Sequence, residues 1–486
     1  MPPLPTTTVH SQAPAASGGR LTLPLPAFLG GARGLQARTL AIALLLTTIV
    51  IVGAIARFDV ANGRPGAESA DQASYVRLAG DLRAYGSYGD SSLHQPFHWA
   101  PGAPVLFAAA DALSGHDVHG VPRIDQRAAL RAEAVVGTGT ILAAFALAAL
   151  LGGAWAGLLA ALVVALYPPL IHSTAYLLSE PLGAFAITTA LATFVWAWRR
   201  RASWAFSVAG AAIGLACLVR ADVALAALLL PLLGGLLIGR RYGWRRGASR
   251  ACAMLLGSAA MIAPWSTYAS TSAGHFIPIT DGSAGTLYVA TYLPGHGTIF
   301  GLKHALAAEV HRAHPSTRKI PDSKIPEGLI LDTVAARHPN LPREGALRKE
   351  ALHNLRVYAL GRPWAFTKMV VSKLWRMWSE YYRGTHRPMV TSTLWEHRAI
   401  VALALIGLLA GLIVRRSRAI GLVLFAIVMT TALDVFFVAE PRHAFRLLPA
   451  LVAAGAAGWA LLISGRRAGA PPPPAPPSPS AARSAG

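Results

Sequence analysis

Asp71 and Glu180 are the carboxylates of this sequence that are best placed for acid–base chemistry. Asp71 begins an expected helix, in which one apolar and aromatic face is made by Tyr75, Leu78, Ala79 and Leu82. Glu180 stands before Pro181, a favourable first helical residue, where a long apolar run begins. Carboxylates are common general acids and bases, but an acid in the first turn also stabilises the helix dipole. Both roles stay open for both residues.

Three arginines could bind a phosphate group, because the planar guanidinium fork matches its oxygen atoms. Arg220 stands two residues before Asp222, so these two charges could instead pair with each other. Arg442 and Arg446 are four residues apart and would share one face of a helix. Their plainer role would be to anchor that helix at a membrane surface.

A metal site has little support in this sequence. His94 and His98 are four residues apart, but Pro96 between them disfavours a regular helix. We therefore expect no metal at these residues. The sequence predicts no definite cofactor and leaves a divalent metal open.

The composition excludes a single soluble enzyme. Of the 486 residues, 54% are hydrophobic and only 14% are charged, whereas about a quarter of a soluble domain is charged. With only two cysteines, Cys217 and Cys252, the chain is not a disulfide scaffold. The net charge of +22 does not indicate a nucleic-acid partner, because many arginines form short clusters between long apolar runs. We predict an all-α polytopic membrane protein whose partners include the lipid bilayer.

Ten apolar runs are long enough to be transmembrane helices. They cover residues 39–56, 128–150, 153–171, 180–198, 203–219, 222–239, 249–266, 397–414, 418–437 and 444–464. Two long polar segments interrupt them, at 57–127 and 267–396, and the second contains an expected interfacial helix at 361–383 rich in Trp and Lys. The runs divide the chain into a transmembrane module at 39–266 and C-terminal helices at 397–464. The ends, 1–38 and the Pro-rich 465–486, are expected to be disordered.

The arginine clusters predict the orientation of these helices. If the N-terminus is cytoplasmic, the clusters at 199–201, 240–250, 415–418 and 466–467 all fall inside, as the positive-inside rule requires. Both termini are then cytoplasmic, and the segments 57–127 and 267–396 are extracytoplasmic. All 22 acidic residues fall in the outer segments or in the outer half of a helix. We therefore expect the chemistry on the outer face of a cell membrane.

Several short motifs along residues 39–464 resemble, in their order, the GT-C superfamily of membrane glycosyltransferases. The most similar type is family 39, the dolichyl-phosphate-mannose protein mannosyltransferases, with bacterial relatives and the lipid A aminoarabinose transferases. The motifs are Asp71-Gln72-Ala73-Ser74-Tyr75, Ala100-Pro101-Gly102-Ala103-Pro104, Tyr167-Pro168 with Ser179-Glu180-Pro181-Leu182, Leu218-Val219-Arg220, Ala263-Pro264-Trp265 and Glu440-Pro441-Arg442-His443.

The resemblance implies transfer of a sugar from a polyprenyl-phosphate donor to an extracytoplasmic acceptor, which could be a protein, a lipid or a cell-envelope glycan. It makes Asp71 the catalytic base, although Gln72 stands where the family usually has a Glu. It implies further donor- and acceptor-site residues at Tyr75, His98, Glu180 and Asp222. The donor phosphate would be bound by Arg220, Arg442 and Arg446.

Two other classes of protein stay as alternatives. A transporter of lipid-linked sugars would carry charges near the middle of the bilayer, and often two similar halves. The sequence shows no such halves, and Asp434 is the only acid well inside an expected span. A polysaccharide polymerase or ligase would also use arginines in outer loops, but it would not be expected to place an acid–aromatic helix directly after its first span.

Overall fold

The computed structural model of this protein describes residues 32–63, 70–89, 96–115, 123–380, 382–383, 387–388 and 391–464. The chain divides into two units, residues 1–44 and residues 45–486. In the first unit, the described residues are helical from Ala32 onward, so this helix begins inside the range 1–38 that we predicted as a disordered arm. The rest of that arm and the predicted tail at 465–486 lie outside the described residues.

Helices account for nearly all of the regular structure. They are α1 (Ala32–Asn62), α2 (Ala70–Tyr85), α3 (Gly102–Leu113), α4 (Gln126–Gly152), α5 (Ala154–Leu166), α6 (Pro168–His172), α7 (Ser179–Arg200), α8 (Ser203–Val219), α9 (Ala224–Tyr242), α10 (Trp244–Ala273), α11 (Ser283–Thr291), α12 (Ile299–Ala313), α13 (Glu327–Ala335), α14 (Arg343–Asn354), α15 (Pro363–Ser379), α16 (Thr391–Ile413), α17 (Arg418–Phe436) and α18 (Leu448–Ser464).

Short elements connect these helices. They are the 3-10 turns η2 (Pro96–His98), η3 (Ser173–Ala175), η4 (Ala221–Val223), η5 (Leu293–Gly295), η6 (Pro315–Lys319), η7 (Asp322–Lys324) and η9 (Pro441–Ala444), and the π-helical turn η8 (Leu355–Leu360). Two strands, β1 (Tyr382–Arg383) and β2 (Arg387–Pro388), pair in antiparallel fashion.

The predicted fold class, an all-α multi-pass membrane protein, is confirmed. Within the described residues, six helices are long and apolar enough to cross a membrane: α1, α4, α7, α9 extended through η4, α16 and α17. The pair formed by α5 and the α6–η3 segment, bent by 56°, would make a seventh span. Helices also occupy the other predicted positions, as α8, α10 and α18. The number ten stays a prediction, since α8 and α18 are shorter than a full span and α10 does not pass the same test.

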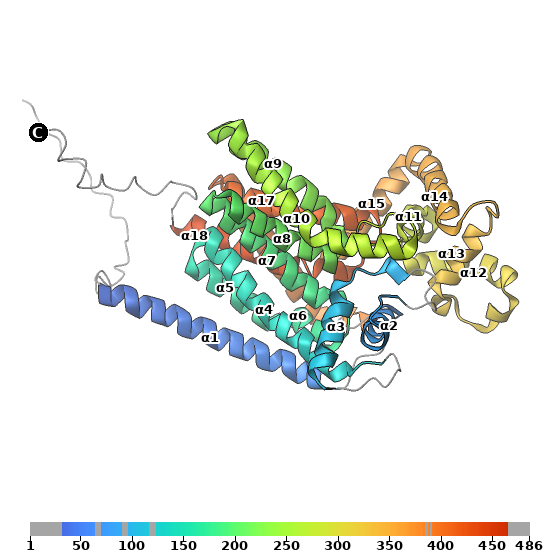
Figure 1. Ribbon diagram of the computed structural model, residues 1–486, viewed down its shortest axis with the longest axis horizontal. Coiled ribbons are helices and arrows are strands. Elements are labelled where there is room, and N and C mark those ends of the chain that lie inside the picture. The colour runs from blue at the N-terminus through green and yellow to red at the C-terminus, as the bar shows by residue number, and fades with distance from the viewer. Residues whose placement is uncertain are drawn as a thin grey trace, which may run out of the picture. The chain divides into compact units, whose positions relative to one another are not determined.

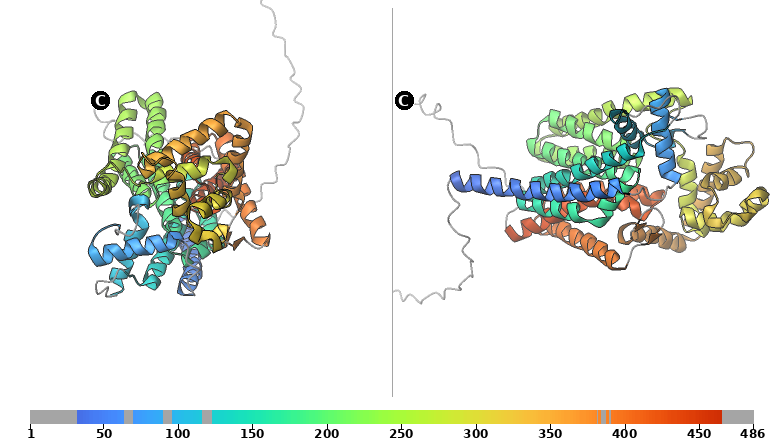
Figure 2. Two further views of the ribbon diagram at one scale, coloured as in Figure 1. Left: turned by 90° about the vertical axis from the view of Figure 1, so that its right-hand side faces the viewer. Right: turned by 90° about the horizontal axis from the view of Figure 1, so that it is seen from below.

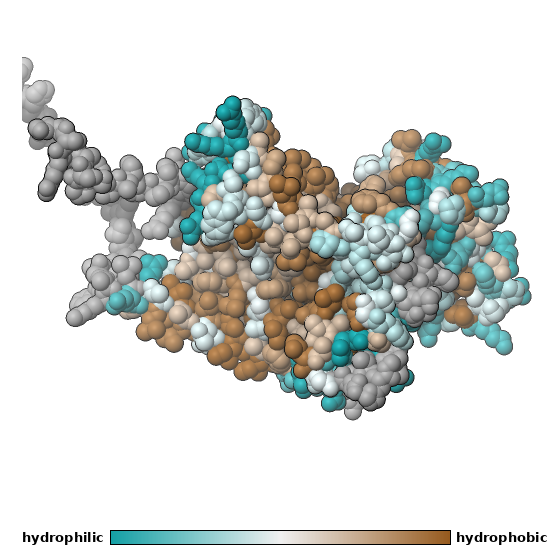
Figure 3. Space-filling view, viewed as in Figure 1, coloured by the Kyte–Doolittle hydropathy of each residue, from teal (hydrophilic) through white to brown (hydrophobic). Residues whose placement is uncertain are grey.

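The spans pack closely because small residues face one another. Helices α4, α5, α7, α8 and α10 run side by side (Figures 1 and 2), and their outward surface is mostly hydrophobic (Figure 3). Gly210 of α8 lies so close to the backbone at Met254 of α10 that a side chain at this position would not fit. Ser258 of α10 donates a 2.8 Å hydrogen bond to the carbonyl oxygen of Gly210. Such contacts stabilise helix pairs in a bilayer, where the apolar surroundings provide no hydrophobic driving force.

A buried arginine supports the break between α5 and α6. Tyr167 and the following Pro168 end α5, which leaves carbonyl groups at its C-terminus without helical partners. Arg57 of α1 is 1% exposed and donates to the carbonyl oxygens of Val164 at 2.8 Å and Ala165 at 3.2 Å.

The second polar segment builds a small helical layer of its own. Helices α11 to α14 group at one end of the spans and share an apolar core around Tyr288, Leu302, Ile330 and Leu347 (Figure 1). The predicted interfacial helix at 361–383 corresponds to α15, Pro363–Ser379. Cys217 and Cys252 are both free, Cys217 buried and Cys252 exposed.

The contact between α16 and α18 gives a test of this packing. A methyl group on Gly458 would collide with the carbonyl group of Gly407, whereas one on Gly421 of α17 would meet only the end of the Leu412 side chain. We expect Gly458→Ala to destabilise the protein by about 1–3 kcal/mol, the usual cost of overpacking, and Gly421→Ala to have little effect. Thermal unfolding in detergent measures both variants. Equal melting temperatures would show that the two helices are not in close contact.

Candidate active site

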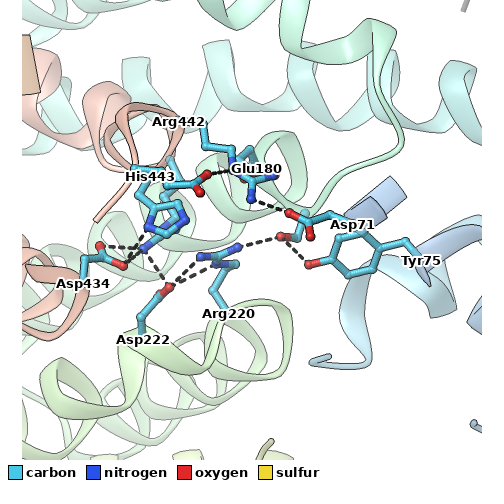
Figure 4. Close-up of polar contacts among 11 residues, drawn as sticks. Asp71, Tyr75, Glu180, Arg220, Asp222, Asp434, Arg442 and His443 are labelled. Carbon is cyan, nitrogen blue, oxygen red and sulfur yellow. Dashed lines mark hydrogen bonds and ion pairs between the residues drawn. The ribbon is translucent and has the colours of Figure 1, made fainter. Parts of the chain in front are cut away.

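Residues from five separate segments meet at one end of the spans. Asp71 and Tyr75 lie in the first turns of α2, and Glu180 lies in the first turn of α7. Arg220 ends α8 and Asp222 lies in η4, while Asp434 lies near the end of α17. Arg442 and His443 belong to η9. Their side chains point toward one another (Figure 4). Each stands at a helix end or in a turn, where a polar group can face the interior without interrupting a helix.

Arg442 joins three carboxylates. Its Nη2 atom hydrogen-bonds Asp71 Oδ2, and its Nε atom lies 2.7 Å from Glu440 Oε2 and 3.6 Å from Glu180 Oε1. Burial alone would lower the pKa of Arg442, but Glu440, Asp71 and Glu180 outweigh it and raise that pKa well above its ordinary value. Burial also raises the pKa of Asp71, but Arg442 holds it below its ordinary value. Asp71 is therefore an ionised carboxylate.

Arg220 forms the second part of the cluster. Its Nε and Nη2 atoms donate to Asp222 Oδ2 at 3.1 and 2.9 Å, so the pairing of these neighbours that the sequence left open does occur. Nη1 donates to Ser179 Oγ at 3.0 Å, which also accepts a 3.0 Å hydrogen bond from the Tyr75 hydroxyl group. Burial raises the pKa of Tyr75 to about 12, so this side chain stays a neutral phenol and a hydrogen-bond donor.

Arg446 forms the third part and is fully buried. Its Nη2 atom lies 2.6 Å from Asp434 Oδ2 and 2.7 Å from Asp222 Oδ2. His443 Nδ1 lies 3.4 Å from Asp434 Oδ1. Burial, together with the charges of Arg446 and Arg220, lowers the pKa of His443 to about 3, so its ring is neutral. Arg446 is therefore an interior residue of the cluster, and the role of surface anchor that the sequence left open does not apply to it.

Arg442 and Arg446 do not lie on one helical face, which corrects an expectation from their spacing. Pro441 starts the 3-10 turn η9, and α18 begins only at Leu448, so the chain between them is not one regular helix. As a result, the two guanidinium groups bind different carboxylates, Asp71 and Asp434.

His98 lies beside the cluster and reaches it through the ring of Trp99. Its ring packs edge-on against Trp99, and Trp99 packs against Tyr75 with ring centroids 5.1 Å apart. Burial lowers the pKa of His98, which favours its neutral form. His94 lies outside the described residues.

Four members of the cluster were not among the predicted site residues. These are Ser179, Asp434, Glu440 and His443. Asp434 carried a usable signal, because an acid within an apolar span is costly and usually functional. The other three lie within two residues of a predicted residue in the chain, but only the fold shows that they point inward.

The cluster has more acidic than basic groups. Five carboxylates lie there against three guanidinium groups, namely Asp71, Glu180, Asp222, Asp434 and Glu440 against Arg220, Arg442 and Arg446. Among the residues that the structure describes, no three His, Cys, Asp or Glu side chains are grouped so as to hold a metal ion. A divalent metal, which the sequence left open, stays a prediction.

Comparisons with known proteins agree with the motifs. Residues 111–276 match the family model described as dolichyl-phosphate-mannose-protein mannosyltransferase. No protein with a curated description matches the chain in sequence.

Solved structures of an archaeal oligosaccharyltransferase share the fold. The archaeal oligosaccharyltransferase AglB from Archaeoglobus fulgidus, in complex with an inhibitory peptide and a dolichol-phosphate, has a TM-score of 0.54 at 13% identity, over 88% of this chain and 51% of that one. The apo form of the Archaeoglobus fulgidus oligosaccharyltransferase gives a TM-score of 0.53 at 15% identity, over 87% and 51% of the two chains. ArnT from Cupriavidus metallidurans, bound to undecaprenyl phosphate, has a TM-score of 0.39 at 17% identity, over 90% of this chain and 79% of that one.

This chain spans about half the length of the archaeal oligosaccharyltransferase chains that it matches. The family-model match at residues 111–276 and the shared fold thus confirm the resemblance to GT-C membrane glycosyltransferases that the sequence motifs indicated.

Proposed function

We propose that this protein transfers a sugar from a polyprenyl-phosphate donor to an acceptor on the extracytoplasmic side of the membrane. The observation that carries the proposal is the ionised, partly exposed Asp71 carboxylate, held by Arg442 at the meeting point of five segments. The mannosyltransferase family match and the dolichol-phosphate in the AglB complex support a lipid-phosphate donor.

The proposed reaction is an inverting displacement at the anomeric carbon. The acceptor oxygen forms a bond to that carbon, the bond from carbon to the phosphate oxygen breaks, and the polyprenyl phosphate leaves with the electron pair. Asp71 takes the acceptor proton, a general-base role for which its ionised form is required. Arg220 and Arg442 are partly exposed cations of the cluster, so they offer donors for negative charge on the leaving phosphate.

The alternatives find no specific support in this cluster. A transporter would need charges near the middle of the bilayer, whereas Asp434 lies two residues before the end of α17 and is bound by Arg446. A polymerase or ligase would use the same outer face and would differ in its donor and acceptor.

Asp71→Asn tests the proposed base. Asn keeps the shape of the side chain but cannot take the proton, so we expect turnover to fall by about 100-fold or more. Thermal stability should change little by comparison. The measurement is consumption of a polyprenyl-phosphate sugar by the purified protein, with a panel of donors tested first on the native protein.

Asp59→Asn is the matched control, because Asp59 is an exposed acid near the end of α1. It should transfer sugar at the native rate. Native turnover in Asp71→Asn, or an equal loss in Asp59→Asn, would show that Asp71 is not the base.

Arg442→Gln tests the phosphate-binding role. A charge-assisted hydrogen bond contributes about 1.5–3 kcal/mol, so its loss should raise the KM for the donor by about tenfold or more. Arg220→Gln should act in the same direction. Arg337→Gln is the control, since Arg337 is paired with Glu309 and Glu350 in the outer helical layer. If the donor KM is unchanged in Arg442→Gln and Arg220→Gln, these arginines only hold the carboxylates in place.

We also propose that both termini are cytoplasmic and that the cluster faces outward, as the arginine clusters favour. After Cys252→Ser removes the exposed native cysteine, Lys349→Cys should react with an impermeant thiol reagent in intact cells. Arg245→Cys, also exposed, should react only after lysis. The reverse pattern would place the cluster on the cytoplasmic side.

A further inference from the structure

A large apolar groove lies beside α15, and none of the charged residues of the cluster lines it. It has a volume of about 1010 Å³, and its walls come mainly from α15, α16 and α17. Two of these helices, α16 and α17, are among those long and apolar enough to cross a membrane. The groove therefore faces the hydrocarbon region of the bilayer, where lipid chains rather than water-soluble ligands can enter it.

Tryptophans mark the position of this groove in the bilayer. Trp375, Trp378 and Trp395 line it, and Trp375 and Trp395 are 63% and 64% exposed. Exposed tryptophans are enriched at the boundary between lipid tails and headgroups. An occupant would thus have its chains in the groove and its headgroup near these rings.

Two cationic side chains line the groove, those of Lys373 and Arg398. None of the lining residues that the structure describes is acidic. Lys373 is 1% exposed, and its ammonium donates a 2.8 Å hydrogen bond to the carbonyl oxygen of Phe437. An ammonium has three donors, so this bond leaves capacity for a ligand. Arg398 donates to the carbonyl oxygen of Ser379 at 3.0 Å, with its guanidinium over the ring of Trp395. The groove therefore combines apolar walls with positive charge.

We infer that the groove binds one anionic phospholipid of the surrounding bilayer, with its acyl chains between α15, α16 and α17 and its phosphate at Lys373 and Arg398. The donor is not the expected occupant. The lining includes none of the charged residues of the cluster, and a phosphate bound by Lys373 and Arg398 would be bound by cations other than those facing Asp71.

This lipid site is connected to the cluster through Lys373. The carbonyl group that Lys373 binds belongs to Phe437, directly after α17, and α15 packs against η9, which carries Arg442. A phosphate at Lys373 would contact the same ammonium that holds this segment. The bound phospholipid therefore supports the position of Arg442 from outside the cluster.

Native mass spectrometry of the full-length protein, released from nanodiscs, tests the inference. In nanodiscs that mix phosphatidylcholine and phosphatidylglycerol, one phosphatidylglycerol should stay bound to the protein. Lys373→Met and Arg398→Met should each weaken its binding by about tenfold or more. Lys368→Met is the matched control, because Lys368 is an exposed cation of α15 that does not line the groove.

Each other result would overturn the inference. Equal retention of phosphatidylcholine would exclude recognition of an anionic headgroup. Displacement of phosphatidylglycerol by an equal amount of polyprenyl phosphate would make the groove a donor site instead. If Lys373→Met fails to fold, Arg398→Met decides alone, and unchanged binding in that variant contradicts the site. Because lipid binding is measured without sugar transfer, a failure here leaves the proposed function untouched.

Discussion

The ion pairs between arginines and carboxylates are the constraint on which this end of the molecule depends. A charge removed from water costs several kcal/mol unless an opposite charge and hydrogen bonds compensate it. Arg446 is fully buried and meets that requirement through Asp434 and Asp222. Because η4, α17 and the segment before α18 each supply one partner, these segments can only adopt arrangements that keep the pairs together.

The same pairs set the chemical character of the cluster. Asp71 faces Arg442, so its carboxylate stays ionised despite its burial. His443 faces Arg446 and Arg220, so its ring stays neutral. A general base must be free of a proton at working pH, and Arg442 is the largest influence that offsets the effect of burial on Asp71. The arginines thus prepare the base as well as offering charge to a leaving phosphate.

The sequence predicted the elements of this site better than their contacts. Hydropathy gave the apolar helices, and the residues Asp71, Glu180, Arg220 and Arg442 do meet in the fold. Periodicity failed where the chain forms a 3-10 turn, since η9 replaces the regular helix that would have put Arg446 beside Arg442. Contacts over long separations in the chain have no local pattern that would reveal them.

Arg57 shows why such contacts escape prediction and why they matter. Read alone, an arginine near the end of an apolar run looks like a residue that reaches toward the headgroups. In the fold it is buried and binds the carbonyl groups of Val164 and Ala165, which the bend before Pro168 leaves without helical partners. The carbonyl groups at the break need a donor, and the buried guanidinium group of Arg57 needs acceptors, so each satisfies the other. Neither feature can be inferred from its own segment, because the partner lies more than 100 residues away in the chain.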